Sequence, residues 1–300
     1  MENELLNIIC QVLNCTQKDI TNIKTMKKGM TNLSYIFSIK EQKYIIRIPG
    51  EGTDKLINRK EEAEVYKQIE GKEICDKLYY INPDTGIKIS QYIENSRCCD
   101  AFNEHDLKIC MNKLREFHNM KLKTNHEFNI YEKIDFYESL WTKHSIFEDY
   151  EQTKRNTLSL KKYIDFCKPE YSLTHIDAIC DNFLFSNNGD GSEKLQLIDW
   201  EYSGMQDQHV DIAMFCIYSI YERNQIDRLI DIYFEDNCSQ QNRIKIYCYI
   251  SLCGLLWSNW CDYKRQLGIE FGEYHKAQYD FAKNYYTIAI EEIKKLGVTL

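Results

Sequence analysis

The sequence has few of the features that mark nucleic-acid-binding chains or chains of tethered domains. Only 3 of its 300 residues are proline, and no proline-rich linker or internal repeat interrupts it, so we expect its parts to be joined by a hinge. It contains no basic stretch, and its formal net charge is −8. Because nucleic acids are bound by releasing counterions from phosphates, this charge argues against a nucleic-acid partner.

The sequence also lacks the patterns typical of a disulfide scaffold or of a membrane span. The 13 cysteines are odd in number and include no CxxC pair, and residues 1–4 do not begin a signal-peptide pattern. We therefore expect reduced thiols in a cytoplasmic protein. The longest apolar run, residues 246–257, is broken by Ser251 and is too short to cross a bilayer, so it predicts a core helix and no membrane partner.

The most informative pattern combines two carboxylates and an amide. HIDAICDN, residues 175–182, contains Asp177 and Asn182, and IDWEY, residues 198–202, contains Asp199. Phosphoryl transfer from ATP requires one carboxylate to orient and deprotonate the attacking hydroxyl, and an Asn and a second Asp to hold magnesium against the phosphates. The spacing therefore indicates phosphoryl-transfer chemistry.

The surrounding residues predict how these side chains are presented. Residues 171–174 form an extended entry to the loop of Asp177, whereas residues 182–185 and 195–198 alternate as strands. The segment Asn187-Asn188-Gly189-Asp190-Gly191 between the two strands is a dense turn signal. We expect a hairpin that brings Asn182 and Asp199 together.

The first ninety residues predict a small antiparallel sheet with one helix. The strands are expected at residues 20–26, 33–39, 44–48 and 87–94, and the helix at residues 58–69. From Asp106 onward the apolar spacing is helical, which predicts a mostly helical remainder. His118 ends the first of these helices and is interpreted as a packed or capping residue.

These motifs resemble those of the choline/ethanolamine kinases of the bacterial choline kinase type, within the aminoglycoside-phosphotransferase and protein-kinase-like superfamily. The family patterns HxDxxxxN and IDxEY stand here as HIDAICDN and IDWEY. The resemblance implies a two-lobed α+β protein-kinase-like fold. Residues 1–93 would form a small antiparallel-sheet lobe for the nucleotide, and residues 94–300 a larger, mostly helical catalytic and substrate-binding lobe.

The resemblance also implies an activity and residue roles. ATP and Mg²⁺ would be used to phosphorylate the hydroxyl of choline, a small-molecule substrate. Asp177 would be the catalytic base, His175 would stabilise its loop, and Asn182 and Asp199 would bind magnesium. Asp211, in the triplet Asp-Ile-Ala, would tie down the catalytic loop.

The turn at residues 28–32 predicts a close backbone approach to phosphates, with an ordinary hairpin as the alternative. The family has a GGxTN loop here, and Lys28 replaces its first glycine. The resemblance assigns Gly29, Thr31 and Asn32 to the nucleotide phosphates. At the end of the last predicted strand of this lobe, Tyr92 and Ile93 would bind adenine through backbone groups.

Arg47 lies in mid-strand between isoleucines, where a charge is costly unless it has a partner. The resemblance places this cation on the α- and β-phosphates. We expect Glu62 on the following helix to orient it, with Glu61 and Glu64 as alternatives. A solvated helix face is the other interpretation of these glutamates.

Aromatic pairs spaced three residues apart share a helix face in the C-terminal third: Tyr218 with Tyr221, and Trp257 with Trp260. A quaternary ammonium donates no hydrogen bonds and is held instead by aromatic π faces. Core packing is the alternative for these pairs.

The resemblance favours a choline pocket and adds Glu201 and Tyr202 to the amine side, while Gln278 stands where the family usually has Arg. Alternative activities are ethanolamine or aminoglycoside phosphotransfer, and the non-enzyme alternative is a pseudokinase that binds ATP or quaternary amines.

Overall fold

The chain forms two compact units. The computed structural model describes residues 3–26, 32–50, 53, 56–187 and 193–298. Residues 1–99 and 181–203 make up the N-terminal unit, and residues 100–180 and 204–300 make up the C-terminal unit. The expected division at residues 93 and 94 therefore differs from the structure, because the segment 181–203 returns to the N-terminal unit.

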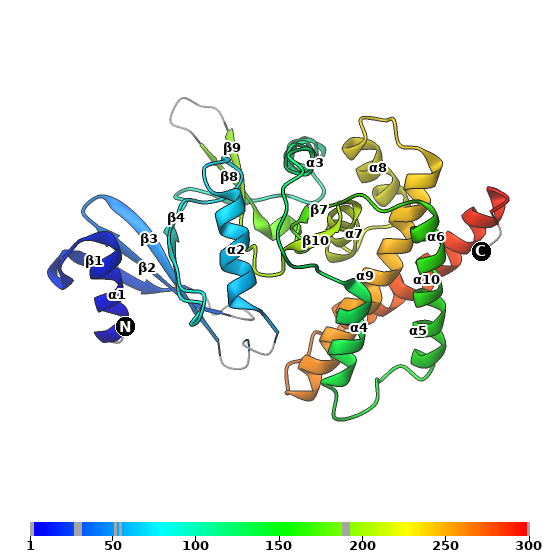
Figure 1. Cartoon of the computed structure of the whole chain (residues 1–300), viewed down its shortest axis with the longest axis horizontal. Coiled ribbons are helices and arrows are strands. Elements are labelled where there is room, and N and C mark those ends of the chain that lie inside the picture. The colour runs from blue at the N-terminus through cyan, green and yellow to red at the C-terminus, as the bar shows by residue number, and fades with distance from the viewer. Residues whose placement is uncertain (1–2, 27–31, 51–52, 54–55, 188–192, 299–300) are drawn as a thin grey trace. The chain divides into compact units, whose positions relative to one another are not determined.

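A five-stranded antiparallel sheet forms the centre of the N-terminal unit (Figure 1). In the order β1-β2-β3-β5-β4, its strands are β1 (Ile20–Thr25), β2 (Asn32–Ile39), β3 (Gln42–Pro49), β5 (Lys88–Gln91) and β4 (Leu78–Ile81). Phe37, Ile46 and Ile89 are fully buried on one face and belong to the same apolar core as Leu5 and Ile9 of α1 (Asn3–Leu13). The strands expected in this part of the sequence are confirmed, with β5 shorter than expected.

The opposite face of the sheet is contacted by α2 (Arg59–Ile69). The helix begins after Asn58, whose side chain accepts hydrogen bonds from the backbone N–H groups of Lys60 and Glu61 and so satisfies two donors that a helix start leaves free. Ile89 of β5 faces α1, so its neighbour Lys88 points to the α2 side. There its ammonium donates to Glu62 of the helix.

The predicted hairpin is present. β8 (Phe183–Asn187) and β9 (Glu193–Leu197) pair antiparallel with Phe183 opposite Leu197, and β6 (Arg97–Cys98) pairs with the outer side of β8. The predicted turn between the hairpin strands lies, from residue 188 to residue 191, outside the described residues. Short 3₁₀ turns precede β1 (Gln17–Asp19) and β8 (Cys180–Asn182).

The C-terminal unit is mostly helical, as expected. Its helices are α3 (Glu104–Asn119), α4 (Ile130–Ser139), α5 (Tyr150–Ser159), α6 (Lys161–Phe166), α7 (His209–Tyr218), α8 (Arg223–Tyr233), α9 (Gln240–Gln266) and α10 (Glu273–Lys295). A small antiparallel pair, β7 (Tyr171–Thr174) with β10 (Gly204–Asp207), completes it. The long helix α9 contacts α4, α5, α6, α7 and α10, and it contains the core helix predicted from the run 246–257.

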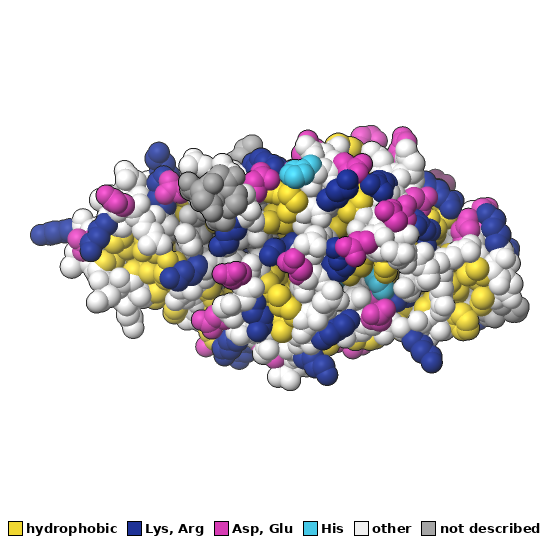
Figure 2. Space-filling view, turned by 90° about the horizontal axis from the view of Figure 1, so that it is seen from above, with side chains coloured by type: hydrophobic (Ala, Val, Ile, Leu, Met, Phe, Trp, Pro, Cys, Tyr) yellow, Lys and Arg dark blue, Asp and Glu magenta, His cyan; other side chains and the backbone are white. Residues whose placement is uncertain are grey.

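None of the helices in the described part of the chain is long and apolar enough to cross a membrane. On the face drawn in Figure 2, Lys and Arg side chains are interspersed with Asp and Glu side chains. The excess of acidic residues in the sequence is therefore mixed with basic residues over this surface.

Close packing of α9 against α10 depends on Gly254. A Cβ atom at this position would lie 2.7 Å from the backbone oxygen of Gln278 and 2.8 Å from the backbone nitrogen of Ala282. Both atoms belong to the α10 backbone, so the helices would have to move apart to admit a methyl group.

We expect Gly254→Ala to destabilise the protein. Alanine favours a helix over glycine by about 1 kcal/mol, but overpacking against a fixed backbone costs about 1–3 kcal/mol, so the clash should dominate. Thermal melting checks this, and Gly254→Val should lower the melting temperature further. A variant Gly254→Ala that melts above the wild type would contradict the close approach.

Candidate functional site

Asp211 fixes the start of the HIDAICDN segment. Its Oδ2 accepts a hydrogen bond from the backbone N–H of His175 at 3.0 Å, and its Oδ1 accepts one from that of Ile176 at 2.7 Å. Ile176 has a φ of 71°, a left-handed conformation that is costly for a β-branched residue. Asp211 holds the backbone in this conformation, so the structural role that the resemblance gave to Asp211 is confirmed.

Asp211 is itself held by a buried histidine. Nε2 of His118 lies 2.9 Å from its Oδ2, and Nδ1 of His118 lies 2.8 Å from the hydroxyl of Tyr233. His118 and Asp211 are both buried. His118 is therefore a packed residue that supports the loop, as its sequence position indicated. Asp177, two residues after His175, is half-buried in the same unit.

Asn182 and Asp199 lie together at the end of the β8–β9 hairpin. The backbone N–H of Ile198 donates to the backbone oxygen of Asn182 at 2.9 Å, so the two polar side chains flank the first pair of the hairpin. Asp199 has a φ of 69°, which an Asp tolerates better than most residues. The sequence correctly predicted that the hairpin would bring these two residues together.

Arg47 of β3 pairs with Asp199. The guanidinium contacts both carboxylate oxygens, with Nη2 3.2 Å from Oδ2, and it lies 3.8 Å from Glu201. Burial disfavours the charge on Arg47, but Asp199 and Glu201 outweigh it and raise the pKa of the guanidinium. This bidentate pair is the geometry in which Arg and carboxylate interact most strongly.

The predicted pair between Arg47 and Glu62 is wrong. Lys88 lies directly opposite Arg47 on the neighbouring strand, and its ammonium lies 2.8 Å from Glu62. Arg59, one turn earlier on α2, lies 2.9 Å from the other oxygen of Glu62. Although burial opposes ionisation, Lys88 and Arg59 together lower the pKa of Glu62. Glu62 is therefore paired with Lys88 and Arg59, and Arg47 is paired with Asp199 at the end of the hairpin.

Glu201 and Asn32 belong to the same network. The side-chain amide of Asn32 donates to Glu201 at 3.1 Å, and Arg59 donates to the same oxygen at 3.2 Å. Burial and the nearby Asp199 raise the pKa of Glu201. Glu201 is thus an ion-pair partner of Arg59. Tyr202, the next residue, is half-buried in a turn. Gly29 and Thr31 lie outside the described residues.

A pocket of about 310 Å³ opens beside this network within the N-terminal unit, at the lower end of the size range of small-molecule sites. One part of its wall is charged and carries Arg47, Lys88 and Asp199. The other part includes the apolar side chains Met26, Ile45, Leu184 and Ile198 and the segment Gln91-Tyr92-Ile93. An apolar slot that ends in cations suits a planar base with attached phosphates, and it contains the predicted residues Tyr92 and Ile93.

The donors at the hairpin fit a magnesium ion. Mg²⁺ prefers oxygen ligands and is usually held by one or two carboxylates together with substrate phosphates and water. Asp199 supplies a carboxylate that lines the pocket, and Asn182 supplies an amide oxygen at the same end of the hairpin. Within the described part of the chain, no group of three or more His, Cys, Asp or Glu residues could hold a metal by itself.

Five aromatic side chains form a continuous row in the C-terminal unit. Successive ring centroids are 5.5, 5.1, 6.4 and 6.2 Å apart. The members, in order, are Trp257, Trp260, Phe271, Tyr274 and Tyr218. All but Trp260 are half-buried, so the row presents aromatic surface that core packing does not use up.

Only one of the two candidate tyrosines, Tyr218 at the end of α7 and Tyr221 just after it, belongs to the row. Tyr221 is buried, packs against Phe102 and Phe215, and donates its hydroxyl hydrogen bond to the backbone oxygen of Ala101. Tyr218 instead lies against Tyr274. The row also includes Phe271 and Tyr274, around the start of α10. The family resemblance extends to their segment, residues 269–274, but neither is among the substrate residues assigned from the sequence.

Asp177 belongs to the same unit as this row. Burial is the main factor that raises the pKa of the Tyr274 hydroxyl, and the charges of Cys261, Asp177 and Tyr218 add to it. Tyr274 therefore stays neutral.

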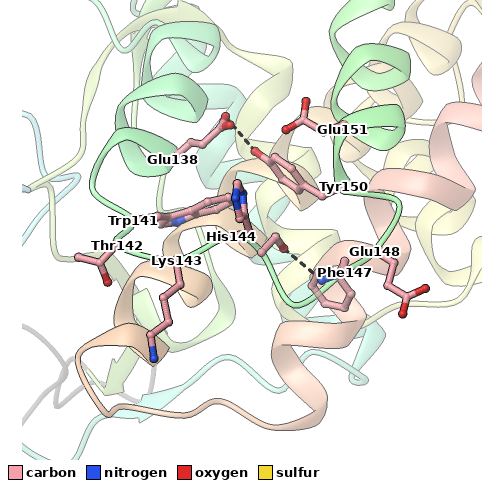
Figure 3. Close-up of a pocket in the computed structure, with 10 residues that line it drawn as sticks. Glu138, Trp141, Thr142, Lys143, His144, Phe147, Glu148, Tyr150 and Glu151 are labelled. Atoms are coloured by element: carbon pink, nitrogen blue, oxygen red, sulfur yellow. Dashed lines mark hydrogen bonds between the residues drawn. The ribbon is translucent and has the colours of Figure 1, made fainter.

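A second pocket in the C-terminal unit, of about 490 Å³, contains none of the predicted site residues (Figure 3). The loop between α4 and α5 forms it, with Trp141 and Tyr150 packed edge to face. The polar groups of this loop are used to dock it on α9: the Trp141 indole donates to the Asn259 oxygen, and Ser145 donates to Asp262. These contacts indicate that the loop between α4 and α5 has a structural role.

Comparison with known proteins identifies the family. The sequence model described as choline/ethanolamine kinase matches residues 23–252. The chain belongs to this family. Protein LicA of Haemophilus influenzae is 26% identical over 270 residues, which cover 84% of this chain and 97% of that protein.

Solved structures of family members match almost the whole chain. Choline kinase LicA from Streptococcus pneumoniae is 27% identical, with a TM-score of 0.74, and the match covers 98% of this chain and 99% of that one. A structure of LicA in complex with AMP is 28% identical, with a TM-score of 0.77, and the match covers 96% of this chain and 99% of that one. The kinase-like fold and the phosphotransferase class expected from the sequence are thus confirmed.

We expect Asp211→Ala to lower both stability and turnover. The change leaves two backbone N–H groups and His118 without their acceptor in a buried place, at a cost of about 3 kcal/mol or more. Chemical denaturation measures the loss, and Asp211→Asn, which keeps one acceptor oxygen, should lose less. Equal unfolding free energies for Asp211→Ala and the wild type would show that Asp211 does not hold the loop.

Proposed function

We propose that the protein transfers the γ-phosphoryl group of ATP to the hydroxyl of choline. The observation that carries this proposal is the aromatic row, which offers the π faces that a quaternary ammonium requires, in a chain of the choline/ethanolamine kinase family. Asp177, the proposed base, belongs to the same unit as the row.

Aromatic faces favour choline over a primary amine. A quaternary ammonium is bound by π faces, at roughly 0.5–2 kcal/mol per ring, and it needs no hydrogen-bond acceptor. A primary ammonium, as in ethanolamine, loses hydrogen bonds to water when it enters such a surface. The half-buried Trp257, Phe271, Tyr274 and Tyr218 therefore support choline as the preferred substrate.

In the proposed reaction, ATP occupies the pocket of the N-terminal unit, with its base beside Gln91-Tyr92-Ile93 and its phosphates near Arg47. Arg47 neutralises phosphate charge, and Asn182 and Asp199 hold magnesium, which when bound neutralises the charge that develops on the phosphates. Asp177 orients the choline hydroxyl and accepts its proton. His175 is buried behind the loop and supports its shape.

We also propose that the protein acts in the cytoplasm with small molecules as its partners. None of the 13 cysteines forms a disulfide in the structure, which is the usual state in a reducing compartment.

The direct test is identification of the product. The protein is incubated with ATP, MgCl₂ and choline, and the reaction is analysed by mass spectrometry, with ethanolamine and kanamycin as alternative acceptors. We expect phosphocholine and ADP in equal amounts. Formation of no phosphorylated product with any acceptor, although ATP binds, would support a pseudokinase instead.

We expect Asp177→Asn to reduce kcat by about 10²- to 10⁴-fold, the usual contribution of a general base. The amide keeps the size of the side chain but accepts no proton, so the melting temperature should not change. Asp165→Asn, in which the replaced carboxylate is exposed and pairs with Lys161, is the matched control and should keep wild-type kcat. A wild-type kcat for Asp177→Asn would remove Asp177 from the chemistry.

Trp257→Leu should weaken choline binding selectively. The leucine keeps an apolar side chain but removes one π face, so we expect the KM for choline to rise about five- to thirtyfold, corresponding to about 1–2 kcal/mol, with little change in the KM for ATP. Trp141→Leu removes another half-buried tryptophan of the same unit, outside the row, and is the control. Core packing alone would explain Trp257 if its replacement lowered the melting temperature and left the KM for choline unchanged.

A further inference from the structure

Asp76 is a buried carboxylate in the wall of the N-terminal pocket. It lies in the connection between α2 and β4, is 8% exposed, and lines the pocket together with Tyr66, Lys88 and Ser90. Its Oδ1 is buried and has no hydrogen-bond partner, and among the described residues Asp76 makes no ion pair. A buried, unsatisfied carboxylate oxygen is costly, so a ligand is the natural source of the missing donor.

The other buried charges of the pocket wall are already matched. Arg47 is paired with Asp199, and Lys88 with Glu62. Lys88 also donates to the hydroxyl of Tyr66 at 2.9 Å. The network is therefore complete without Asp76, and the free acceptor is directed at what the pocket binds.

The backbone around Asp76 is fixed on both sides. The oxygen of Cys75 accepts a hydrogen bond from Gln196 of β9 at 2.8 Å, and the oxygen of Lys77 accepts one from the N–H of Gln91 at the end of β5, also at 2.8 Å. Asp76 is thus held between β9 and the segment Gln91-Tyr92-Ile93. A preformed position of this kind allows one polar group to select a ligand.

The chemistry of the nucleotide determines which part can face Asp76. Phosphates are excluded because they repel a carboxylate, and Arg47, whose side chain is 19% exposed, is the more accessible cation for them. Asp76, Ser90, Tyr66 and Lys88 are all at most 8% exposed and mark the deep part. Glu62 already neutralises Lys88 there, so the deep part suits the uncharged base. A carboxylate only accepts hydrogen bonds, so the group that meets it must be a donor.

We propose that Asp76 accepts a hydrogen bond from the exocyclic amino group of adenine and thereby selects adenine over 6-oxopurines. The 6-oxo group of hypoxanthine is a hydrogen-bond acceptor like the carboxylate of Asp76, so the two would repel each other. This inference rests on the proposed function, because it takes the pocket to be the ATP site. It names a specificity-determining residue for that site.

Direct binding tests the proposal. Isothermal titration calorimetry of the full chain, with MgCl₂ present, compares ATP with inosine triphosphate and with purine riboside triphosphate, which lacks the amino group. We expect the wild type to bind ATP about tenfold or more tightly than either analogue, the typical effect of one hydrogen bond to a charged group. In Asp76→Asn the amide can donate to a 6-oxo group, so the preference for ATP over inosine triphosphate should shrink at least about fivefold.

The matched control is Asp84→Asn, the same substitution at a side chain that is 77% exposed and 3.6 Å from Lys60, and it should keep the wild-type preference. Asp76→Asn should melt at or above the wild-type temperature, because it removes an unpaired buried charge. Its binding constants then report on a folded protein.

Two results would overturn the assignment of Asp76 while ATP still binds: equal affinity of the wild type for ATP and purine riboside triphosphate, or equal losses for all three nucleotides in Asp76→Asn. A third contradicting result is that Asp76→Asn changes only the ratio of the affinities for ATP and 2′-deoxy-ATP, which would place Asp76 at the ribose. Absence of any nucleotide binding to the wild type would instead overturn the proposed function, and this inference with it.

Discussion

The ion pair between Arg47 and Asp199 joins the two parts of the N-terminal unit that are most distant in sequence. Arg47 lies in the middle of a sheet, where an unpaired charge would be strongly destabilising, and Asp199 ends the hairpin that returns from beyond residue 180. The pair therefore ties the hairpin to the sheet and sets the charged end of the pocket. In the proposed reaction it would also hold the cation for the phosphates and the carboxylate for magnesium in place before a ligand arrives, which is the preorganisation that electrostatic catalysis requires.

The second group of functional residues is held by different means. In the C-terminal unit, Asp211 and His118 fix the backbone before Asp177, including the left-handed Ile176. The close contact of α9 and α10 at Gly254 holds together the helices that carry Trp257 and Tyr274. In the proposed reaction, the N-terminal unit would supply the nucleotide pocket and the metal donors, and the C-terminal unit would supply the base and the aromatic surface.

Local patterns were sufficient to predict the hairpin, the meeting of Asn182 with Asp199, and four of the five strands of the sheet, because each depends on alternation and turn residues within a short segment. The edge strand β4 was not predicted. Local patterns could not assign the partner of Arg47. The partner of Arg47 depends on the strand register that sets Lys88 opposite Arg47, and on the pairing of Arg59 with Glu62 at the start of α2. Both are features of the tertiary structure. Asp76 could not be predicted for a similar reason, since a connecting segment has no periodicity and its surroundings are set only when the neighbouring elements are in place.

This chain belongs to a family that phosphorylates choline or ethanolamine, and we propose that it holds the quaternary ammonium of choline on the aromatic row. A competition reaction tests it most directly: limiting ATP, MgCl₂, and equal concentrations of choline and ethanolamine, with both products quantified by mass spectrometry. We expect phosphocholine to predominate from the earliest time points. Predominance of phosphoethanolamine, or consumption of ATP without either product, would contradict it.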